Sequence, residues 1–138
     1  MEDPKIKIVI ADDNREFCNI LNDYLLMQED IVVTGIAENG IEALKLIKEK
    51  KPDLVILDII MPFLDGLGVL EKLNTMDLDP LPRVIVLSAI GQEKTTQRAI
   101  SLGADYYVIK PFDMEIFIRR IRQTLNNTID DVKKPVHM

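Results

Sequence analysis

The sequence predicts an α/β fold in which helices cover both faces of a parallel β-sheet. Two observations lead to this prediction. Short runs of β-branched and other apolar residues recur along the chain, and each run is followed by a segment with apolar residues at helical spacing. Continuous apolar runs are typical of parallel strands that are buried on both faces. Right-handed crossovers place helices on both faces, so the five strand–helix units predict a doubly wound, five-stranded parallel sheet.

The first two strand–helix units begin near the N-terminus. The apolar run 6–11 predicts the first strand, and apolar residues at helical spacing predict a helix over 15–28. The run 31–36 predicts the second strand. Asn39-Gly40 then breaks the chain before a second helix, which apolar residues mark through 41–47.

The third and fourth units are separated by a proline-rich turn. The run 54–57 predicts the third strand, and leucines at helical spacing through 67–73 predict the helix that follows. Residues 79–82, with the sequence Asp-Pro-Leu-Pro, are expected to form a rigid turn because proline restricts the backbone. The run 84–87 predicts the fourth strand, and a polar helix is expected over 93–102.

The fifth unit completes the predicted domain. Gly103 is expected to stop the polar helix. The run 106–109 predicts the fifth strand, and apolar residues through 116–125 predict the last helix. We therefore expect one domain over 5–127. Residues 128–138 show little apolar periodicity and are expected to form a linker or tail.

The composition limits the classes of function. At 138 residues, of which 47% are hydrophobic, the chain is long enough for one domain with a hydrophobic core. A net charge of −6 argues against nucleic-acid binding by a general basic surface. No apolar stretch has membrane-spanning length and residues 1–4 do not resemble a signal peptide, so we expect a cytoplasmic protein without a membrane segment. The single cysteine, Cys18, lies in an apolar helical pattern and is expected to be buried.

Four of the five expected strands end at residues that phosphoryl chemistry uses. The first strand is followed by Asp12 and Asp13, and the third by Asp58. Ser88 follows the fourth strand, and Lys110 follows the fifth. Because ligands of open parallel sheets bind outside the carboxyl ends of the strands, we expect these side chains to share one crevice. The set predicts a site for a metal ion and a phosphoryl group.

The three carboxylates favour a bound cation, because like charges in one crevice repel one another. Hard oxygen ligands at a partly solvated site suit Mg²⁺, which also binds phosphate oxygens. With the charge of a phosphoryl group neutralised in this way, a carboxylate can act as nucleophile. Lys110 would supply a second positive charge, and the Ser88 hydroxyl can donate a hydrogen bond to the attached phosphoryl group.

Each of these residues also has a purely structural interpretation. Asp12-Asp13 can cap the following helix, and Asp58 can be a turn residue at the end of a strand. Ser88 can cap a helix, and Lys110 can be a solvated lysine in a loop. Four chemically matched strand ends in one sheet are hard to obtain by chance, and this favours the functional interpretation.

Five short motifs at the predicted strand ends and loops form a specific set. They are Ala11-Asp12-Asp13-Asn14, Leu57-Asp58-Ile59-Ile60-Met61-Pro62, Asp65-Gly66, Ser88-Ala89 and Lys110-Pro111-Phe112. The set resembles that of bacterial two-component response-regulator receiver domains, and the resemblance covers 5–127. It implies a flavodoxin-like (βα)5 fold with strand order 2-1-3-4-5. Longer matches at the first, third and fifth strands most resemble the receiver of the master sporulation response regulator of endospore-forming bacteria.

The resemblance implies which residues take the phosphoryl group and hold the metal. Asp58 would be the phosphoacceptor. Asp12, Asp13 and Asp58 would bind Mg²⁺, with Ca²⁺ or Mn²⁺ as substitutes. The backbone carbonyl of Ile60 would complete the protein ligands.

The resemblance also implies a switch. Lys110 would contact the phosphoryl group, and the Lys110-Pro111 peptide is expected to be cis. Ser88 and Tyr107 would be the switch pair, in which the hydroxyl moves toward the phosphate and the aromatic ring follows inward. The activated domain would form a homodimer through the last two helices and the fifth strand.

We therefore expect a regulatory phosphoacceptor whose chemistry is limited to its own phosphorylation and dephosphorylation. It would take the phosphoryl group from a phosphohistidine of a histidine kinase or phosphotransferase and control an attached DNA-binding effector domain, in sporulation. A stand-alone phosphorelay receiver is the first alternative. A Mg-dependent phosphatase with an aspartate nucleophile is the second, although Ile60 stands where such enzymes usually carry a general acid. A flavin-binding module would need a Ser-, Thr- and Gly-rich loop where Asp12-Asp13 stand.

Overall fold

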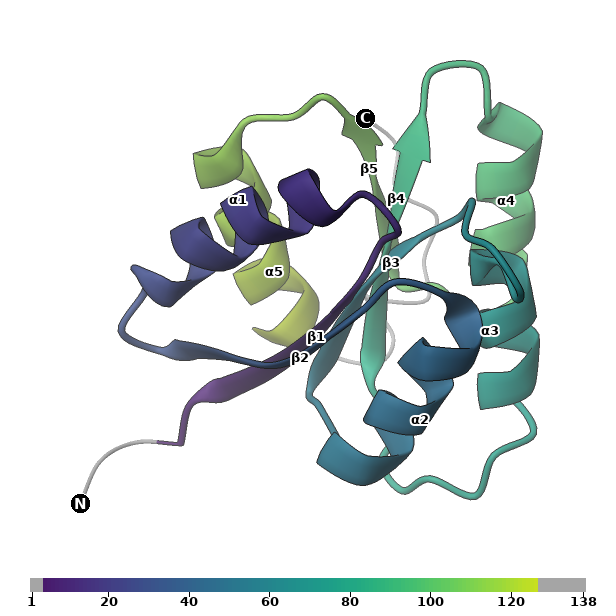
Figure 1. Cartoon of the computed structure of the whole chain (residues 1–138), viewed down its shortest axis with the longest axis horizontal. Coiled ribbons are helices and arrows are strands. Elements are labelled where there is room, and N and C mark those ends of the chain that lie inside the picture. The colour runs from purple at the N-terminus through teal and green to yellow at the C-terminus, as the bar shows by residue number, and fades with distance from the viewer. Residues whose placement is uncertain (1–3, 127–138) are drawn as a thin grey trace.

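The computed structural model describes residues 4–126, which form a five-stranded sheet in the order β2-β1-β3-β4-β5. Every pair of neighbouring strands is parallel. Figure 1 shows helices on both sides of this sheet. The doubly wound sheet and its strand order are therefore confirmed, whereas the expected tail over 128–138 lies outside the described residues. Within 4–126, none of the helices has the length and apolar composition that crossing a bilayer requires.

The strands and helices alternate along the chain as expected. The strands are β1 (Ile6–Ala11), β2 (Ile31–Ala37), β3 (Leu54–Asp58), β4 (Arg83–Ala89) and β5 (Tyr106–Lys110). The helices are α1 (Arg15–Leu26), α2 (Gly40–Lys50), α3 (Gly66–Leu73), α4 (Glu93–Ser101) and α5 (Met114–Asn126). Helix α1 ends at Leu26 rather than at the expected residue 28, because the Met27 N–H bonds back to the Tyr24 carbonyl at 3.2 Å and tightens the last turn.

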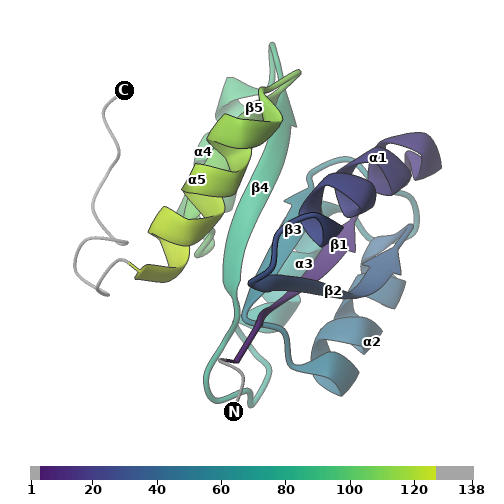
Figure 2. The same cartoon turned by 90° about the vertical axis from the view of Figure 1, so that its left-hand side faces the viewer.

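Two hydrophobic clusters lie on opposite faces of the sheet. Leu54 and Ile56 of β3 belong to the cluster beneath α1 and α5. Val55 and Leu57 belong to the cluster beneath α2, α3 and α4. Figure 1 shows this division into two helical layers, and Figure 2 views the sheet from the side of α1 and α5. All four of these β3 residues have 0% exposure, so packing on both faces holds the strand in place up to its end at Asp58.

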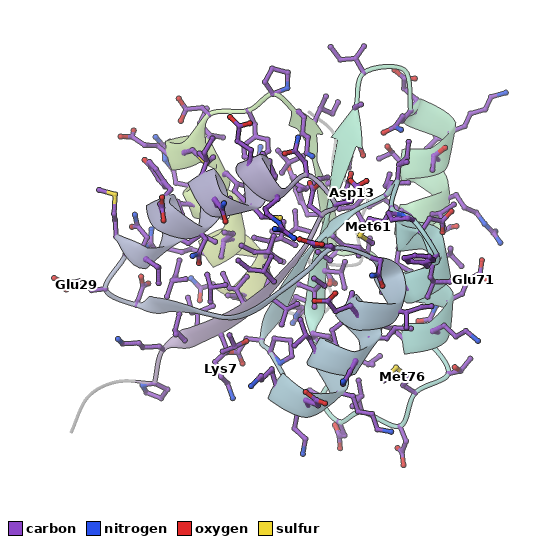
Figure 3. All side chains as sticks on the ribbon, in the orientation of Figure 1. Lys7, Asp13, Glu29, Met61, Glu71 and Met76 are labelled. Carbon is purple, nitrogen blue, oxygen red and sulfur yellow. The ribbon has the colours of Figure 1, made fainter. Side chains whose placement is uncertain are left out.

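The carboxyl ends of the parallel strands meet at one edge of the sheet. From β1 the chain passes to β2 on one side and then returns to β3 on the other, so the strand order reverses beside β1. Open α/β sheets bind ligands at such a reversal. Figure 3 shows Asp13 and Met61 at this end of the sheet, with Lys7 and Met76 toward the opposite end.

Gly66 lets the start of α3 press against the end of β3. A Cβ atom at Gly66 would lie 2.5 Å from the carbonyl oxygen of Asp58 and 2.8 Å from Cα of Ile59. The Gly66 N–H also donates a 2.7 Å hydrogen bond to the Ile59 carbonyl. Because both neighbours are backbone atoms, a side chain here would displace the strand end that carries Asp58.

Gly66→Ala is expected to destabilise the fold by about 2 kcal/mol or more, since the added methyl group overpacks against backbone. Urea unfolding of the variant and the parent measures this difference. Gly35→Ala is the matched control, because the three atoms nearest to its Cβ would all belong to the rotatable Leu46 side chain, the first at 3.0 Å. Equal losses of stability in the two variants would contradict the constraint at Gly66.

Candidate functional site

Three carboxylates meet at the carboxyl edge of the sheet. Asp12 and Asp13 follow β1 and Asp58 ends β3, and ligand atoms of the three lie within 4.8 Å of one another. Asp12 is fully buried, Asp58 is half-buried and Asp13 is exposed. The structure thus brings together the three acidic residues that the sequence analysis selected. Their mixed exposure leaves one side of the cluster open to solvent.

Asp12 is held by two donors. One carboxylate oxygen, Oδ1, accepts a hydrogen bond from the Asn14 N–H at 2.9 Å. The other, Oδ2, lies 2.6 Å from the Lys110 Nζ. The cap of α1 is Asn14, whose side chain accepts from the Phe17 N–H at 3.0 Å. Asp12 and Asp13 are therefore free of the capping role that was their structural alternative.

Lys110 is an organised part of the site rather than a solvated loop lysine. Its side chain is 28% exposed, and the ammonium pairs with Asp12 at 2.6 Å. The same ammonium lies over the ring of Phe17, 4.2 Å from its centroid, a cation–π contact. Phe112 packs edge-on against Phe17 with ring centroids 6.0 Å apart. The Lys110-Pro111 peptide is cis, as expected.

The contact with Phe17 was not found from the sequence. Its only signal there was an apolar residue at helical spacing in the first helix, which equally fits a core position.

Burial, together with the neighbouring carboxylates, raises the pKa of Asp58 from its ordinary 3.8 to about 6. Burial of the carboxyl group is the largest cause, followed by the charge of Asp12. Lys110 acts in the opposite direction, and Asp13 adds a further increase. The carboxylate of Asp58 is therefore poorly stabilised until positive charge is added to the site.

Ser88 is buried at the end of β4, with 2% exposure, and its hydroxyl is already engaged. Its Oγ lies 2.7 Å from Oγ1 of Thr96, a residue of α4 that is 7% exposed. Tyr107, on the neighbouring strand β5, is half-buried against the cluster beneath α2, α3 and α4. Its ring stacks on that of Tyr106 with centroids 6.0 Å apart. Ser88 and Tyr107 thus lie on adjacent strands and on the α4 side of the sheet.

Thr96 is a second contact that sequence reasoning missed. It lies in a polar helix, where a threonine gives no sign of being buried or of facing a strand end.

Three large apolar side chains are exposed in the loops that follow β3 and β4. Ile60, two residues after Asp58, is 62% exposed, and Ile90, two residues after Ser88, is 81% exposed. Phe63, in the loop after β3, is 84% exposed and has a positive φ of 68°. A left-handed backbone is unfavourable for a bulky residue, so the loop is strained at Phe63.

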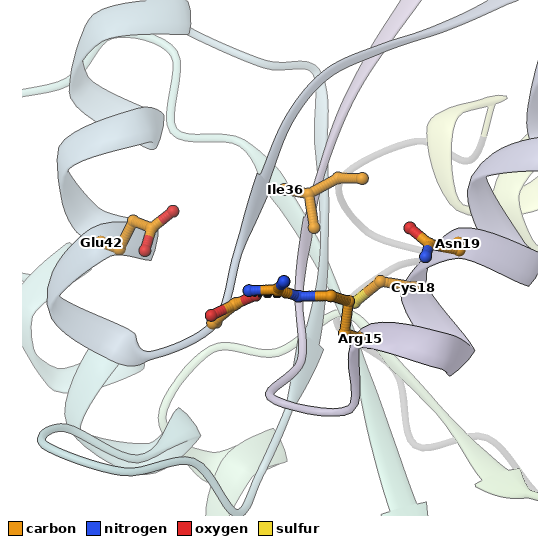
Figure 4. A pocket seen from close by; sticks show the side chains of 6 residues that line it. Arg15, Cys18, Asn19, Ile36 and Glu42 are labelled. Atoms are coloured by element: carbon orange, nitrogen blue, oxygen red, sulfur yellow. Dashed lines mark hydrogen bonds and ion pairs between the residues drawn. The ribbon is translucent and has the colours of Figure 1, made fainter.

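A pocket of about 420 Å³ lies between α1, the end of β2 and the start of α2. It is lined by Arg15, Cys18, Asn19, Ile36, Glu38 and Glu42. Figure 4 shows the Arg15 side chain extending across it, where it forms a 2.6 Å ion pair with Glu38. Cys18 is buried, as expected, and its thiol donates to the Asp12 carbonyl at 3.3 Å. Burial and then the charge of Asp12 raise the pKa of Cys18 to about 11, so this thiol stays protonated and unreactive near neutral pH.

The raised pKa of Asp58 predicts a pH dependence of stability in metal-free buffer. The Asp58 carboxyl group has a pKa near 3.8 in the unfolded chain and about 6 in the folded protein. Between these two pH values the folded state therefore binds more protons at Asp58 than the unfolded state does. The contribution of Asp58 to stability should therefore fall as pH rises through this window and level off above it. Asp58→Asn should remove that fall and gain about 1–2 kcal/mol at pH 7.5, a value reduced for solvent screening of a partly exposed group.

Urea unfolding at pH 4.5 and 7.5 measures this effect in parent and variant. Asp113→Asn, at an exposed helix cap that asparagine also satisfies, is the control and should keep the parent's pH dependence. An Asp58→Asn variant with the parent's pH profile would refute the raised pKa of Asp58.

Comparisons with known proteins agree with this geometry. The family model described as the response regulator receiver domain matches residues 8–122. The crystal structure of the response regulator domain of Thermotoga maritima CheB is 29% identical, with 90% of this chain and 98% of that chain covered and a TM-score of 0.81. The signal receiver domain of a response regulator from Bermanella marisrubri is 31% identical in sequence. The match covers 88% of this chain and 99% of that chain, with a TM-score of 0.78. A DNA-binding response regulator of the LuxR family from Staphylococcus aureus is 28% identical in sequence. The match covers 88% of this chain and 99% of that chain, with a TM-score of 0.80.

The matched segment begins within β1 and ends within α5, so it contains the whole acidic cluster together with Ser88 and Lys110. The chain therefore belongs to the response regulator receiver domain family.

Proposed function

We propose that this receiver accepts a phosphoryl group on Asp58 from a phosphohistidine of a histidine kinase or phosphotransferase. The observation that carries the proposal is the cluster of Asp12, Asp13 and Asp58 within 4.8 Å at the carboxyl edge of the sheet. The ammonium of Lys110 lies beside this cluster, 2.6 Å from Asp12. Asp58 alone among the three carboxylates ends the central strand β3, in the half-buried position that a nucleophile needs.

The transfer is a displacement at phosphorus. A carboxylate oxygen of Asp58 attacks the phosphorus and forms a new P–O bond, while the P–N bond to the donor imidazole breaks. The electron pair of that bond stays on the imidazole nitrogen, which takes up a proton. Dephosphorylation is the attack of water on the same phosphorus, which returns the Asp58 carboxylate and releases inorganic phosphate.

The donor set fits a hard divalent cation. Carboxylates of differing exposure, close together and open to solvent on one side, suit Mg²⁺, and Ca²⁺ or Mn²⁺ can substitute. Asp12, Asp13 and Asp58 would hold the ion, with the backbone carbonyl of Ile60. When bound, the ion supplies positive charge that neutralises phosphoryl oxygens.

Lys110 and Ser88 have separate roles in this proposal. Lys110 supplies positive charge to the phosphoryl group from the side of α1, where Phe17 limits the positions of its ammonium. Ser88 donates its hydroxyl proton to a phosphoryl oxygen. Tyr107 follows inward and carries the change to the surface formed by α4, β5 and α5.

We further propose that phosphorylation controls an attached DNA-binding effector domain and that this control serves sporulation. We place the protein in the cytoplasm. The similar Staphylococcus aureus protein is itself described as a DNA-binding response regulator, and the longer motifs of this chain resemble sporulation receivers. Activation would pair two copies through α4, β5 and α5. That surface carries Ile109 and Ile116, which are 45% and 52% exposed.

Labelling with acetyl phosphate or a phosphohistidine donor tests the acceptor. Asp58→Asn is expected to abolish stable labelling while keeping the fold, because the side chains are nearly isosteric. Asp113→Asn removes an exposed carboxylate from the same edge of the sheet and should label like the parent. Labelling of Asp58→Asn at full stoichiometry would assign the acceptor elsewhere.

The lifetime of the phosphorylated form should depend on the apolar opening of the site. A hydrolytic water must approach in line behind the phosphorus, and neither Ile60 nor Ile90 can orient it. Ile60→Asn combined with Ile90→Glu is expected to shorten the lifetime several-fold, or roughly 1 kcal/mol of barrier.

Loss of label over time measures this lifetime. The matched control is Ile41→Asn combined with Met27→Glu, since these apolar residues are 61% and 75% exposed on α2 and after α1. Equal decay in all three proteins would show that the isoleucines do not control access.

A further inference from the structure

The Ser88 hydroxyl belongs to a buried chain of two hydrogen bonds. Ser88 Oγ lies 2.7 Å from Thr96 Oγ1, and either atom of that pair can be the donor on geometry alone. Thr96 Oγ1 also lies 2.7 Å from the backbone carbonyl of Gln92. Ser88 and Thr96 are 2% and 7% exposed, so solvent offers neither hydroxyl a ready substitute partner.

Counting protons fixes the direction of this chain. A hydroxyl has one proton to donate, and a backbone carbonyl can only accept. The proton of Thr96 therefore points to the Gln92 carbonyl. The bond between the two hydroxyls must then be donated by Ser88 and accepted by Thr96.

A phosphoryl group on Asp58 would need the same proton. Ser88 follows Leu87, which is paired with Asp58 across the β3–β4 ladder, so the two side chains lie on adjacent strand ends. Phosphoryl oxygens accept hydrogen bonds and do not donate them when ionised. One proton thus has two competing acceptors, Thr96 in the resting protein and the phosphoryl group in the modified one.

Helix α4 depends on few other contacts. Thr96 and Ala99 are its only buried residues. No side chain caps its N-terminus by a hydrogen bond, although the Gln92 side chain accepts from the Ala89 N–H at 2.8 Å. At the opposite end, Asn74 of the α3 cap donates to the Leu102 carbonyl at 2.8 Å. The first turn of α4 is therefore the part that loss of the Ser88–Thr96 bond would release.

We propose that Thr96 is a positioning residue that holds the Ser88 hydroxyl in its resting orientation and competes with the phosphoryl group for its proton. This inference rests on the proposed function, since it needs a phosphoryl group on Asp58. The strength of the Ser88–Thr96 bond then sets how much phosphoryl donor is required for modification. It also sets how firmly α4 is held before modification.

The test compares Thr96→Val, Thr96→Ser and Thr95→Val in the same 138-residue chain. Thr96→Val has nearly the same shape but removes both the acceptor for Ser88 and the donor to the Gln92 carbonyl, whereas Thr96→Ser keeps both. Thr95→Val makes the same chemical change one position earlier in α4, away from the described contact with Ser88. Thermal unfolding is used first to establish that each variant is folded.

Two measurements report on the proposal. In Thr96→Val, the acetyl phosphate concentration for half-maximal labelling should fall roughly fivefold, the factor expected for loss of one competing hydrogen bond. Amide hydrogen exchange in the first turn of unphosphorylated α4 should accelerate toward the rate of the phosphorylated parent. Thr96→Ser should restore both properties, and Thr95→Val should match the parent in both.

A double-mutant cycle separates competition for the proton from a merely structural role. In a Ser88→Ala background no proton is shared, so adding Thr96→Val should leave the half-maximal acetyl phosphate concentration unchanged. An equal effect of Thr96→Val with and without Ser88 would overturn the proposal. So would faster exchange in α4 with parental labelling, or parental behaviour in both measurements.

Failure of the proposed function gives a different result. If the parent itself is not labelled on Asp58, the proposed function fails and the inference fails with it. If the parent is labelled on Asp58 and Thr96→Val behaves like the parent, the function stands and only the role of Thr96 is wrong.

Discussion

Three carboxylates lie within 4.8 Å of one another at the carboxyl edge of the sheet, and their mutual repulsion is the constraint that the surrounding residues meet. Asp12 is fully buried, and its carboxylate accepts from the Lys110 ammonium and the Asn14 N–H. Asp58 is only half-buried, and burial together with the charge of Asp12 raises its pKa to about 6. Protonation of Asp58, a bound divalent cation and the Lys110 ammonium therefore all reduce the same repulsion between carboxylates.

The apolar sheet makes this crowding sustainable. Strand β3 is buried on both faces, and its residues pack alternately into the two hydrophobic clusters. Such packing leaves the strand little freedom to move Asp58 away from the other carboxylates. Gly66 adds a second restriction, because the start of α3 lies so close to the Asp58 carbonyl that no Cβ fits. Relief of the repulsion must then come from added positive charge rather than from movement of the backbone.

The α4 side of the site differs from the acidic side in its physical basis. Around Asp58 the interactions are between charges, whereas Ser88 and Thr96 share neutral hydrogen bonds in a buried position. A single hydroxyl proton is easily redirected, but a buried acceptor that loses its donor destabilises its surroundings. Because α4 buries only Thr96 and Ala99, a small local change there affects a large part of the helix's support. The acidic side of the site is therefore suited to binding a cation, and the α4 side is suited to passing a local change on to the helix.

The sequence by itself determined the doubly wound sheet and the positions of Asp12, Asp13 and Asp58 at strand ends, because parallel strands leave continuous apolar runs and their carboxyl ends share one edge. Only the tertiary structure decided the partners of these residues. Lys110 pairs with Asp12 across 98 positions of sequence, and its ammonium rests on Phe17 of the first helix. Likewise, Thr96 in a polar helix becomes the acceptor for the Ser88 hydroxyl. The periodicity of a sequence indicates which face of a helix or strand is apolar. The direction of one ammonium group or one hydroxyl proton depends instead on groups that are far apart in the sequence and meet only in the folded structure.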